Sequence, residues 1–298
     1  MNKSSFGSHF TVTTWGESHG KALGAVIDGC PAGLTLSEED IQKFLDRRKP
    51  GQSRYTTARK EGDLVEILSG VFEGKTTGTP ISLMVRNTDQ RSRDYGNIAY
   101  SYRPGHADYT FDAKYGFRDY RGGGRSSGRE TIGRVASGAV ASRLLASLGI
   151  SFCTYTKSIG PVSIKEYNPE EINNNAFYMP DADAAAKAGT YLEECMKNQD
   201  SAGGVIECRI SGVPAGLGNP VFEKLDAMLS QAVMSVGAVK AVEIGDGIQV
   251  AHMKGSEDND GFLIKDNVIT KTSNHAGGIM GGISDGSEII LRAYIKPT

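Results

Sequence analysis

The sequence predicts a protein of mixed α and β structure built from two similar halves. Residues 27–34 (IDGCPAGL) recur 183 positions later as residues 210–217 (ISGVPAGL), and the glycine and apolar pattern of residues 70–83 recurs 208 positions later in residues 278–291. Each copy of the first segment follows a strand-like run and precedes a helical pattern, which predicts a duplicated strand–helix–strand unit. The displacements differ by 25 positions, so we expect an insertion between the matched segments of the second half. Chance likeness of glycine-rich turns is the alternative, disfavoured because both pairs keep the same order.

Two helices are predicted from apolar residues at helical spacing. Ser37–Asp40 has the composition of a helix start, and Lys49–Gly51 ends the pattern. A second helix is predicted over Pro220–Met234. The apolar stripes are Ile41, Phe44 and Leu45 in the first helix and Val221, Leu225, Met228, Leu229 and Ala232 in the second.

The predicted strands are apolar runs rich in β-branched residues: Leu23–Ile27, Leu64–Leu68, Ile81–Val85, Val205–Ile210 and Glu288–Ile295. Residues 87–124, by contrast, show little periodicity and contain many Arg, Tyr, Asp and Gly residues. A stretch of this length without its own apolar pattern predicts a functional loop region.

A glycine loop at residues 122–130 (GGGRSSGRE) gives the strongest local signal for function. Ser127 and Glu130 have the spacing of a capping box, and an apolar stripe then runs as far as Gly149, which predicts a helix. The N–H groups at such a helix start attract anions, and Arg125 and Arg129 add charge, so we expect a phosphate site. A capped surface helix with solvated arginines is the alternative.

Two nucleotide-binding motifs are excluded by their spacing. Gly122, Gly124 and Gly128 are one residue too widely spaced for the dinucleotide fingerprint, and no apolar strand precedes them. Residues 70–76 are one residue too short for a P-loop, and residues 77–80 (TGTP) would break the helix that such a loop opens.

Composition excludes several classes of protein. A chain of 298 residues with 39% hydrophobic residues and a formal net charge of -2 is ordinary for a globular protein and disfavours disorder or bulk binding to nucleic acid. No run reaches the roughly 18 apolar residues of a membrane span, and the first ten residues lack a signal-peptide pattern. Cys30, Cys153, Cys195 and Cys208 have no metal-ligand spacing, so no metal site is predicted. We expect a cytoplasmic protein with neither a membrane nor a nucleic acid as partner.

Arginine and histidine supply the remaining candidates. Concentrated arginine suits capture of phosphate and carboxylate, although a solvated face is the alternative for any single run. His19 and His106 stand in compact polar segments and could move a proton near neutral pH; a structural role is the alternative for each, and His275 is a weaker candidate. The basic residues gather at Arg47, Arg48, Lys49, Arg54, Arg59, Lys60, Arg86, Arg91, Arg93, Arg103, Arg118, Arg121, Arg125, Arg129 and Arg134.

Together these segments resemble the chorismate synthase family. The segment 16–20 (GESHG) is similar to the first family signature, and 124–138 (GRSSGRETIGRVASG) is similar to the second. The resemblance extends over the whole chain and includes residues 46–51 (DRRKPG), 87–92 (NTDQRS), 103–108 (RPGHAD), 119–124 (DYRGGG), 242–247 (VEIGDG) and 274–278 (NHAGG).

The resemblance implies an α+β fold, a β-α-β sandwich with helices packed between antiparallel sheets, formed by residues 1–298 as a single domain. It also implies a cytoplasmic homotetramer that requires reduced FMN. The implied reaction is the 1,4-anti elimination of phosphate from 5-enolpyruvylshikimate 3-phosphate to chorismate, the last step of the shikimate pathway, without net redox change. Family members have been linked to NADPH as reductant, and the sequence leaves open whether this chain uses it.

Site residues follow from the matched motifs. His19 would protonate the departing phosphate, His106 would stabilise the protonation state of reduced flavin, and Ser18 and Ser127 would orient these groups. The substrate anions, or NADPH in the case of the first two, would bind Arg48, Arg54, Arg134 and Arg129. The flavin contacts would be Arg125, Ser126, Ser127, Gly237, Ala238, Gly281, Lys296, Pro297 and Thr298.

The family pattern continues beyond Thr298 into a third signature with an Arg-x-Asp-Pro element, whose aspartate assists proton removal through the flavin. From the resemblance we expect the chain as given to fold but to bind FMN weakly. The alternatives are an inactive shortened chain that retains an anion-binding or flavin-binding fold, and a phosphotransferase. The latter is disfavoured because the sequence has neither an Asp-rich magnesium site nor a P-loop lysine.

Overall fold

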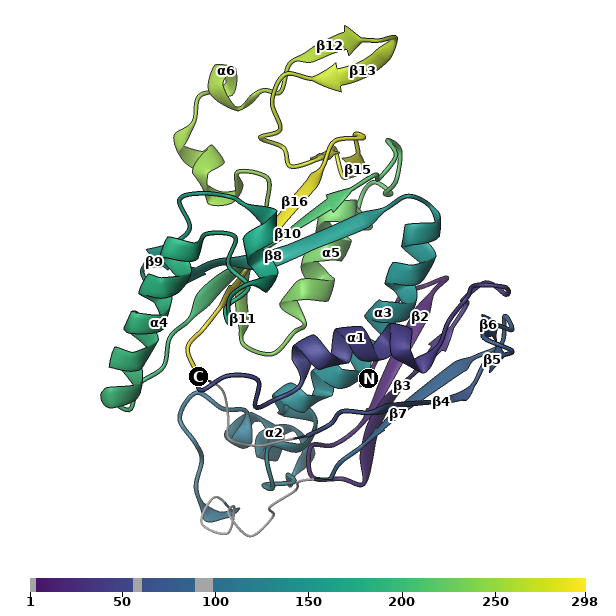
Figure 1. Ribbon diagram of the computed structural model, residues 1–298, viewed down its shortest axis with the longest axis vertical. Coiled ribbons are helices and arrows are strands. Elements are labelled where there is room, and N and C mark those ends of the chain that lie inside the picture. Colours follow the sequence, from purple (N-terminus) through teal and green to yellow (C-terminus); the bar gives the residue numbers. More distant parts are fainter. Residues whose placement is uncertain (1–3, 56–60, 89–98) are drawn as a thin grey trace. The chain divides into compact units, whose positions relative to one another are not determined.

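The computed structural model describes residues 4–55, 61–88 and 99–298 (Figure 1). The chain divides into two compact units, one ending at Leu145 and the other beginning at Ala146. The helices are α1 (Glu38–Arg48), α2 (Asp108–Tyr115), α3 (Thr131–Ser147), α4 (Ala182–Lys197), α5 (Leu225–Met234) and α6 (Gly255–Asp258).

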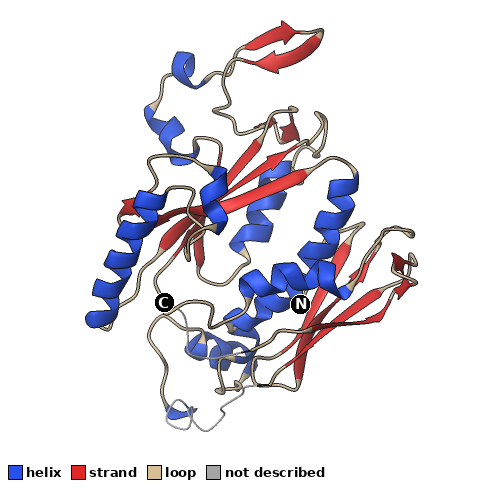
Figure 2. Cartoon of the chain, in the orientation of Figure 1, coloured by secondary structure: helices blue, strands red, loops and turns tan. Residues whose placement is uncertain are grey.

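The first unit contains a five-stranded antiparallel sheet in the order β1-β2-β3-β7-β4. Figure 2 draws its strands in red. A short hairpin of two further strands follows β4. The strands are β1 (Ser5–Phe6), β2 (Thr11–Gly16), β3 (Ala22–Asp28), β4 (Val65–Ser69), β5 (Val71–Phe72), β6 (Lys75–Thr76) and β7 (Ile81–Arg86).

One face of this sheet carries the core of the first unit. Strand β7 alternates buried and less buried residues, with Ile81, Leu83 and Val85 on the buried side. Because successive side chains of a strand point to opposite faces, these three residues share one face. Residues of α1 and α3 belong to the same apolar cluster, so both helices cover that face. Their contributions are Ile41, Leu45, Ile132, Ala136, Ala139 and Val140.

The second unit repeats this arrangement with the sheet order β11-β16-β10-β8-β9, again antiparallel. Helix α5 leads into β11 and contacts it. The strands are β8 (Ser151–Ile159), β9 (Val162–Ser163), β10 (Gly204–Ser211), β11 (Val239–Ile244), β12 (Phe262–Lys265), β13 (Val268–Lys271), β14 (Ile279–Met280), β15 (Ile283–Ser284) and β16 (Ile289–Ile295).

The predicted internal repeat is confirmed at the level of single hydrogen bonds. In the first unit the hydroxyl of Thr76 donates to the carbonyl of Pro31 (2.6 Å) and accepts from the N–H of Leu34 (3.0 Å). In the second unit Ser284 makes the same two bonds to Pro214 (2.6 Å) and Leu217 (2.9 Å). The two hydroxyls are separated by the 208 positions of the second repeat and their partners by the 183 of the first.

The predicted insertion is also confirmed. In the first unit β4 leads almost directly into the β5–β6 hairpin, whereas α6, a short 3-10 helix and the β12–β13 hairpin stand between β11 and the matching β14–β15 hairpin. Figure 1 shows the β12–β13 hairpin extending away from the five-stranded sheet of its own unit. The predicted fold class, α+β with antiparallel sheets and two pseudo-symmetric halves, is therefore correct.

Several local predictions need correction. The second predicted helix begins at Leu225 rather than Pro220, because the N–H of Leu225 is bound to the carbonyl of Gly282 and the preceding residues follow an irregular path. Consequently Val221 is 70% exposed and not part of the apolar stripe. Phe44 of the first helix is 41% exposed, and the strand predicted from Leu64 begins at Val65.

The helix after the glycine loop starts later than predicted. Residues Gly124–Ser126 and Gly128–Glu130 form two 3-10 turns, and α3 begins at Thr131. The hydroxyl of Ser127 accepts from the N–H of Arg129, not from that of Glu130, so the predicted capping box does not form. Glu130 instead uses its carboxylate to bind Thr14 and Arg134.

Candidate active site

His19 lies in the turn that connects β2 to β3 and is 7% exposed. Its Nδ1 lies 3.2 Å from the hydroxyl of Ser18, which also donates to the carbonyl of Gly122 (3.1 Å). A Cβ on Gly122 would lie closer than 3.0 Å to Cε1 and Nδ1 of His19 and 2.9 Å from Oγ of Ser18. The glycine loop therefore packs directly against the imidazole, as only a residue without a side chain can.

The glycine loop is an irregular turn with a left-handed backbone. Gly122, Gly123 and Gly124 all have positive φ angles, of 66°, 83° and 54°. Only glycine readily adopts this left-handed conformation at three successive positions, which explains the composition of the loop. Ser126 donates to the carbonyl of Gly123 (2.7 Å) and so closes the turn.

Asp119 provides negative charge near His19. Burial alone would raise the pKa of Asp119. Hydrogen bonds from the side chain and backbone of Arg121, together with electrostatic interactions with Arg121 and His19, outweigh burial and lower the pKa. Arg121 binds both carboxylate oxygens, at 2.8 Å and 3.1 Å. Asp119 thus stays ionised and places a negative charge near the imidazole.

Arg48 and Arg129 meet at one buried carboxylate. Nη1 of Arg48 lies 2.6 Å from Oδ2 of Asp63, and Nη2 of Arg129 lies 3.1 Å from Oδ1 of the same residue. The Asp63 side chain is completely buried, whereas 18% of the Arg48 side chain and 6% of the Arg129 side chain are exposed. Of these two predicted anion-binding residues, Arg48 is the more accessible.

Arg125 and Arg134 gather around a second carboxylate, that of Glu130. Nε of Arg134 donates to Glu130 at 2.8 Å, and Nη2 of Arg125 lies 3.9 Å from it. Arg125 also donates to the hydroxyl of Thr14 (2.7 Å) and to the carbonyl of Gly16 (3.2 Å). Because Gly16 ends β2, these bonds anchor the glycine loop to the strand that precedes the His19 turn.

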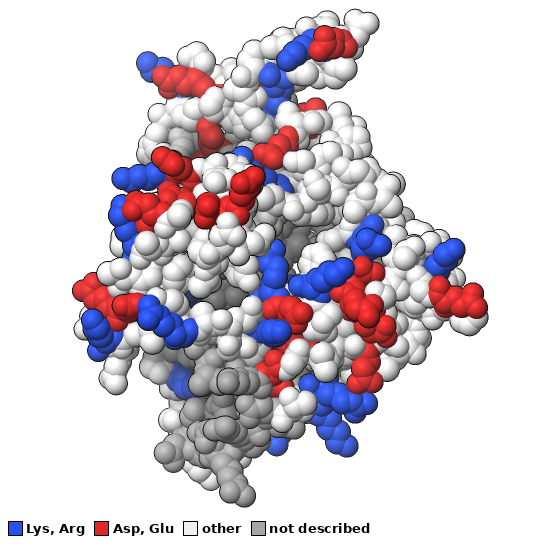
Figure 3. Space-filling view, viewed as in Figure 1, with Lys and Arg blue, Asp and Glu red and all other residues white. Residues whose placement is uncertain are grey.

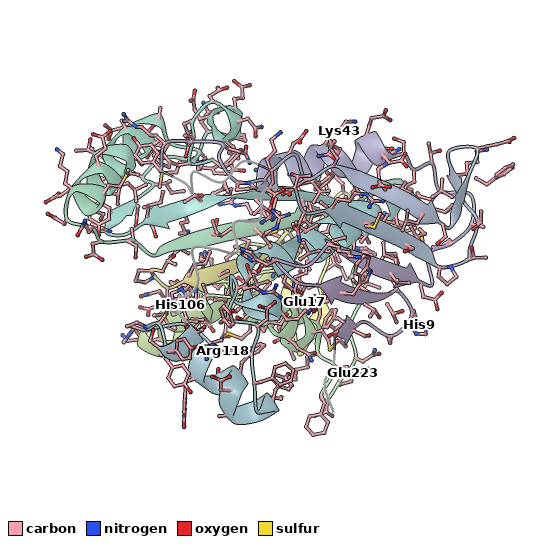
Figure 4. The ribbon with its side chains drawn as sticks, turned by 90° about the horizontal axis from the view of Figure 1, so that it is seen from below. His9, Glu17, Lys43, His106, Arg118 and Glu223 are labelled. Atoms are coloured by element: carbon pink, nitrogen blue, oxygen red, sulfur yellow. The ribbon has the colours of Figure 1, made fainter. Side chains whose placement is uncertain are left out.

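His106 is exposed and lies on the loop before α2 (Figure 4). Its Nδ1 lies 2.9 Å from the carbonyl of Pro104. The loop is held by Arg103, whose guanidinium binds both oxygens of Asp108 at 2.8 Å and 2.9 Å. These bonds, outweighing burial, lower the pKa of Asp108 to about 2. A Cβ on Gly123 would lie 3.6 Å from Nη2 of Arg103, so the His106 loop adjoins the glycine loop.

The arginine-rich character of the first unit is largely balanced by carboxylates. Besides the pairs above, Arg86 binds Glu66, and Arg118 binds Asp112. Figure 3 accordingly shows acidic and basic side chains side by side. Arg54 is exposed, and its Nη2 donates to the hydroxyl of Tyr55 (2.7 Å). Four basic residues of the predicted cluster lie outside the described residues: Arg59, Lys60, Arg91 and Arg93.

The remaining predicted flavin contacts belong to the second unit and fall in two places. The N–H of Lys296 binds the carbonyl of Ala238 (2.9 Å), which brings residues 296–298 beside Gly237 and Ala238, at the end of α5. Gly281 lies in the β14–β15 turn, where the carbonyl of the next residue, Gly282, binds the first N–H of α5. The ten residues of α5, at about 1.5 Å each, separate the two places by about 15 Å.

Four residues that touch the candidate site were not predicted: Glu61, Asp63, Asn87 and Asp119. Asp63, Asn87 and Asp119 each accept a hydrogen bond from a predicted arginine, whereas Glu61 accepts from the N–H of Thr88 and lies 3.9 Å from Nη1 of Arg129. Asn87 and Asp119 open the family-like segments 87–92 and 119–124, whereas no quoted motif includes Glu61 or Asp63. Glu61 and Asp63 do stand two positions apart just before a predicted strand, which is a position from which two carboxylates can enter one site.

Comparisons with known proteins show which family the chain belongs to. The family model described as chorismate synthase matches residues 10–298. The chain belongs to the chorismate synthase family. It is 65% identical to the chorismate synthase of Agathobacter rectalis and 66% identical to that of Lachnoclostridium phytofermentans, in each case over 100% of this chain and 82% of the relative.

A solved structure, "Crystal Structure of Chorismate Synthase", matches with a TM-score of 0.82 and 34% identity, over 97% of this chain and 85% of the other. The predicted family and fold are thereby confirmed. The chain is a carbon–oxygen lyase of aromatic biosynthesis that acts on a small molecule. Among the described helices, none is both long and apolar enough to cross a membrane. In the same residues no group of three or more His, Cys, Asp or Glu residues could hold a metal ion.

Proposed function

We propose that the protein eliminates phosphate from 5-enolpyruvylshikimate 3-phosphate in a 1,4-anti reaction that yields chorismate, as the last step of the shikimate pathway. The observation that carries the proposal is the position of His19 against the glycine loop, within the same unit as Arg48, Arg125 and Arg134. A leaving phosphate needs a proton and fixed positive charge, and this unit offers both. Membership of the family supports the assignment.

His19 would protonate the departing phosphate. The hydroxyl of Ser18 lies within hydrogen-bond distance of Nδ1 of His19. Gly122 packs against Cε1 and Nδ1 of the ring, so the orientation of the imidazole is restricted. The ionised carboxylate of Asp119 places a negative charge nearby, and a general acid requires the protonated imidazole. Ser127 would support the loop through its bond to the N–H of Arg129.

Arg48, Arg54, Arg129 and Arg134 are the proposed contacts of the two carboxylates and the phosphate of the substrate. Arg48 and Arg134 best fit this role, because each side chain is partly exposed, 18% and 35%, while a carboxylate restricts its orientation. A preoriented arginine loses less entropy on binding an anion than a mobile one. By the family resemblance, Arg48 and Arg54 would alternatively bind NADPH, which remains a proposed reductant.

FMN is the proposed cofactor, and each unit by itself contains residues that suit such a ligand. Arg125, Ser126 and Ser127 supply cationic and hydroxyl donors that suit a phosphate. A Cβ on Gly237 or Gly281 would meet nothing within 4 Å, so the backbone there is open to a ligand, and Ala238 and residues 296–298 adjoin Gly237. Reduced FMN, when bound, would supply an electron transiently and recover it, so that the reaction has no net redox change. His106 would hold a proton near the reduced flavin.

We further propose, from the family resemblance, that residues 1–298 act as one domain in a cytoplasmic homotetramer. The test of the function is an anaerobic assay of purified protein with 5-enolpyruvylshikimate 3-phosphate and FMN reduced by dithionite. Chorismate and phosphate should appear in equal amounts, and only with reduced FMN. Equal turnover with oxidised flavin, or with none, would overturn the proposal. Flavin binding without any turnover would favour the alternative of a chain that only binds flavin.

A further inference from the structure

We infer that Asp63 and Asn87 are positioning residues of the proposed active site, which join the His19 turn to Arg48 through Arg129. The inference rests on the proposed function, since it concerns how that site is held. The chain of contacts runs from the His19 turn to Asn87, then to Arg129, to Asp63 and to Arg48. We call these last four residues the strut. All of it lies within the first unit.

The first joint of the strut is Asn87, which directly follows β7. Its Nδ2 donates to the carbonyls of Glu17 (3.1 Å) and Gly20 (2.8 Å), which flank Ser18 and His19. Its backbone N–H donates to the carbonyl of Lys21 (3.1 Å). Through three bonds to one turn, a single asparagine sets the path of the backbone that carries the proposed acid.

The same side chain continues the strut on its other side. Oδ1 of Asn87 accepts from Nε of Arg129 (3.1 Å), so the amide uses both its donor and its acceptor. An aspartate would lack the donor, and a leucine of similar size would lack both. The side chain at this position must therefore be an amide to hold the turn and the arginine together.

The second joint is Asp63, whose two carboxylate oxygens bind two different arginines. Oδ1 accepts from Arg129 (3.1 Å) and Oδ2 from Arg48 (2.6 Å). Arg48 ends α1, and Arg129 stands just before α3, so this carboxylate also ties two helices to each other. Nε of Arg48 also donates to the hydroxyl of Thr131 (3.2 Å), which further restricts the position of the guanidinium.

Charge and burial give the strut its stiffness. Asp63 and Glu61 have fully buried side chains, and Arg129 is 6% exposed, with its Nη1 3.9 Å from Glu61. Two carboxylates thus balance two guanidinium groups where water has little access. In such surroundings charge-assisted bonds are short and directional, and a misplaced partner is costly, so one arrangement is favoured. Arg129, bound to Asn87 on one side and to Asp63 on the other, connects the two joints of the strut.

The two joints act on different steps. Asn87 holds the turn that carries His19, so its loss should lower kcat and alter the pH profile of proton donation. Asp63 holds Arg48, so its loss should raise the KM of the substrate. A purely structural role would lower stability in both variants without dividing the kinetic effects in this way.

The experiment compares Asn87→Ala and Asp63→Asn in the anaerobic assay with reduced FMN. We expect kcat of Asn87→Ala to fall by about tenfold or more with little change in KM. We expect KM of Asp63→Asn to rise by about tenfold with little change in kcat. A tenfold change corresponds to the loss of about one charge-assisted bond. The matched controls are Asp46→Asn, a surface partner of Lys49 on α1, and Asn174→Ala, whose exposed amide binds a backbone carbonyl. Both should match the wild type.

A double-mutant comparison tests whether Asp63 acts through Arg48. Arg48→Gln should itself raise KM, and adding Asp63→Asn to it should change KM by less than about twofold. Additive effects of the two changes would overturn the inference. If Asp63→Asn does not fold, as judged by circular dichroism, Asp63→Glu keeps the charge but displaces the guanidinium, and it should again raise KM with kcat maintained.

The two proposals fail in distinguishable ways. If the wild-type protein makes no chorismate with reduced FMN, the proposed function is wrong. If the wild type is active but Asp63→Asn or Asp63→Glu keeps the wild-type KM, or if Asn87→Ala keeps the wild-type kcat and pH profile, the strut does not position the site. The inference would also be contradicted if kcat and KM worsened equally in both variants and in proportion to the fall in melting temperature.

Discussion

Gly122 lies against the imidazole of His19 so closely that a Cβ at position 122 would overlap two ring atoms. We expect Gly122→Ala to push the imidazole aside and to lower turnover by roughly 10²–10⁴-fold, the range for lost acid catalysis. The change also places alanine at a φ of 66°, at a cost of about 1–2 kcal/mol in stability. Steady-state kinetics and thermal melting measure the two effects separately.

Gly116→Ala is the matched control for that variant. Gly116 has a φ of 80°, so alanine meets the same backbone strain, but a Cβ there has nothing within 4 Å. It should lose similar stability and keep its turnover. If both variants lose activity equally, backbone strain and not contact with His19 is responsible.

His106→Ala should lower turnover by roughly 10²–10⁴-fold and leave the melting temperature nearly unchanged. The side chain is exposed, and its one described bond, to the carbonyl of Pro104, is local. Removing it therefore costs little folding energy. An active variant with a lowered melting temperature would assign His106 a structural role instead.

Glu207 should make the protein sensitive to acid. Burial alone would raise its pKa, but hydrogen bonds from Lys157, Tyr155 and Arg292 outweigh burial and hold the pKa at about 2. A carboxyl whose pKa is lower in the folded than in the unfolded state contributes stability above its unfolded pKa of about 4.5, and this contribution is lost as the pH falls towards 2. Melting curves at several pH values should show that loss.

Glu207→Gln is the variant that isolates this effect. It should be less stable than the wild type at pH 7, because Lys157 and Arg292 lose their charged partner, and its stability should change less between about pH 4.5 and pH 2. Parallel curves for the two proteins across that interval would exclude Glu207 as the cause.

His275 and Asp246 should form a bond that depends on pH in the opposite sense. Nδ1 of His275 lies 2.6 Å from Oδ2 of Asp246, and this hydrogen bond raises the pKa of the histidine above 6.5. The stabilisation is complete below the unfolded pKa and is lost as the pH rises through the folded one. NMR titration of the imidazole should give a midpoint above 6.5 that decreases in Asp246→Asn. An unchanged midpoint in that variant would contradict the assignment.

The fold could be predicted from the sequence because its signals are local. The repeated glycines at positions 70 and 278 both have a φ of 81°, a requirement that leaves a visible mark in the sequence. Alternating apolar residues likewise mark β7 and β16. The start of α5 was mispredicted because it depends on a distant contact: the N–H of Leu225 is bound to Gly282, which no local pattern reveals.

The candidate site was predicted only in part for the same reason. His19 and the glycine loop stand in compact motifs, but their contact joins residues more than a hundred positions apart. The arginines appeared as an excess of positive charge, whereas Asp63 and Glu130 balance much of it. Which carboxylate pairs with which arginine is decided by tertiary structure, so the sequence could indicate an anion site but not the strut that supports it.

The most direct test of the account is the turnover of His19→Ala with 5-enolpyruvylshikimate 3-phosphate and reduced FMN under anaerobic conditions, with its melting temperature measured in parallel. If His19 is the acid that protonates the leaving phosphate, the rate should fall by roughly 10²–10⁴-fold while the protein stays folded. Wild-type turnover with a lowered melting temperature would show that His19 is structural and would contradict the placement of the reaction at the glycine loop.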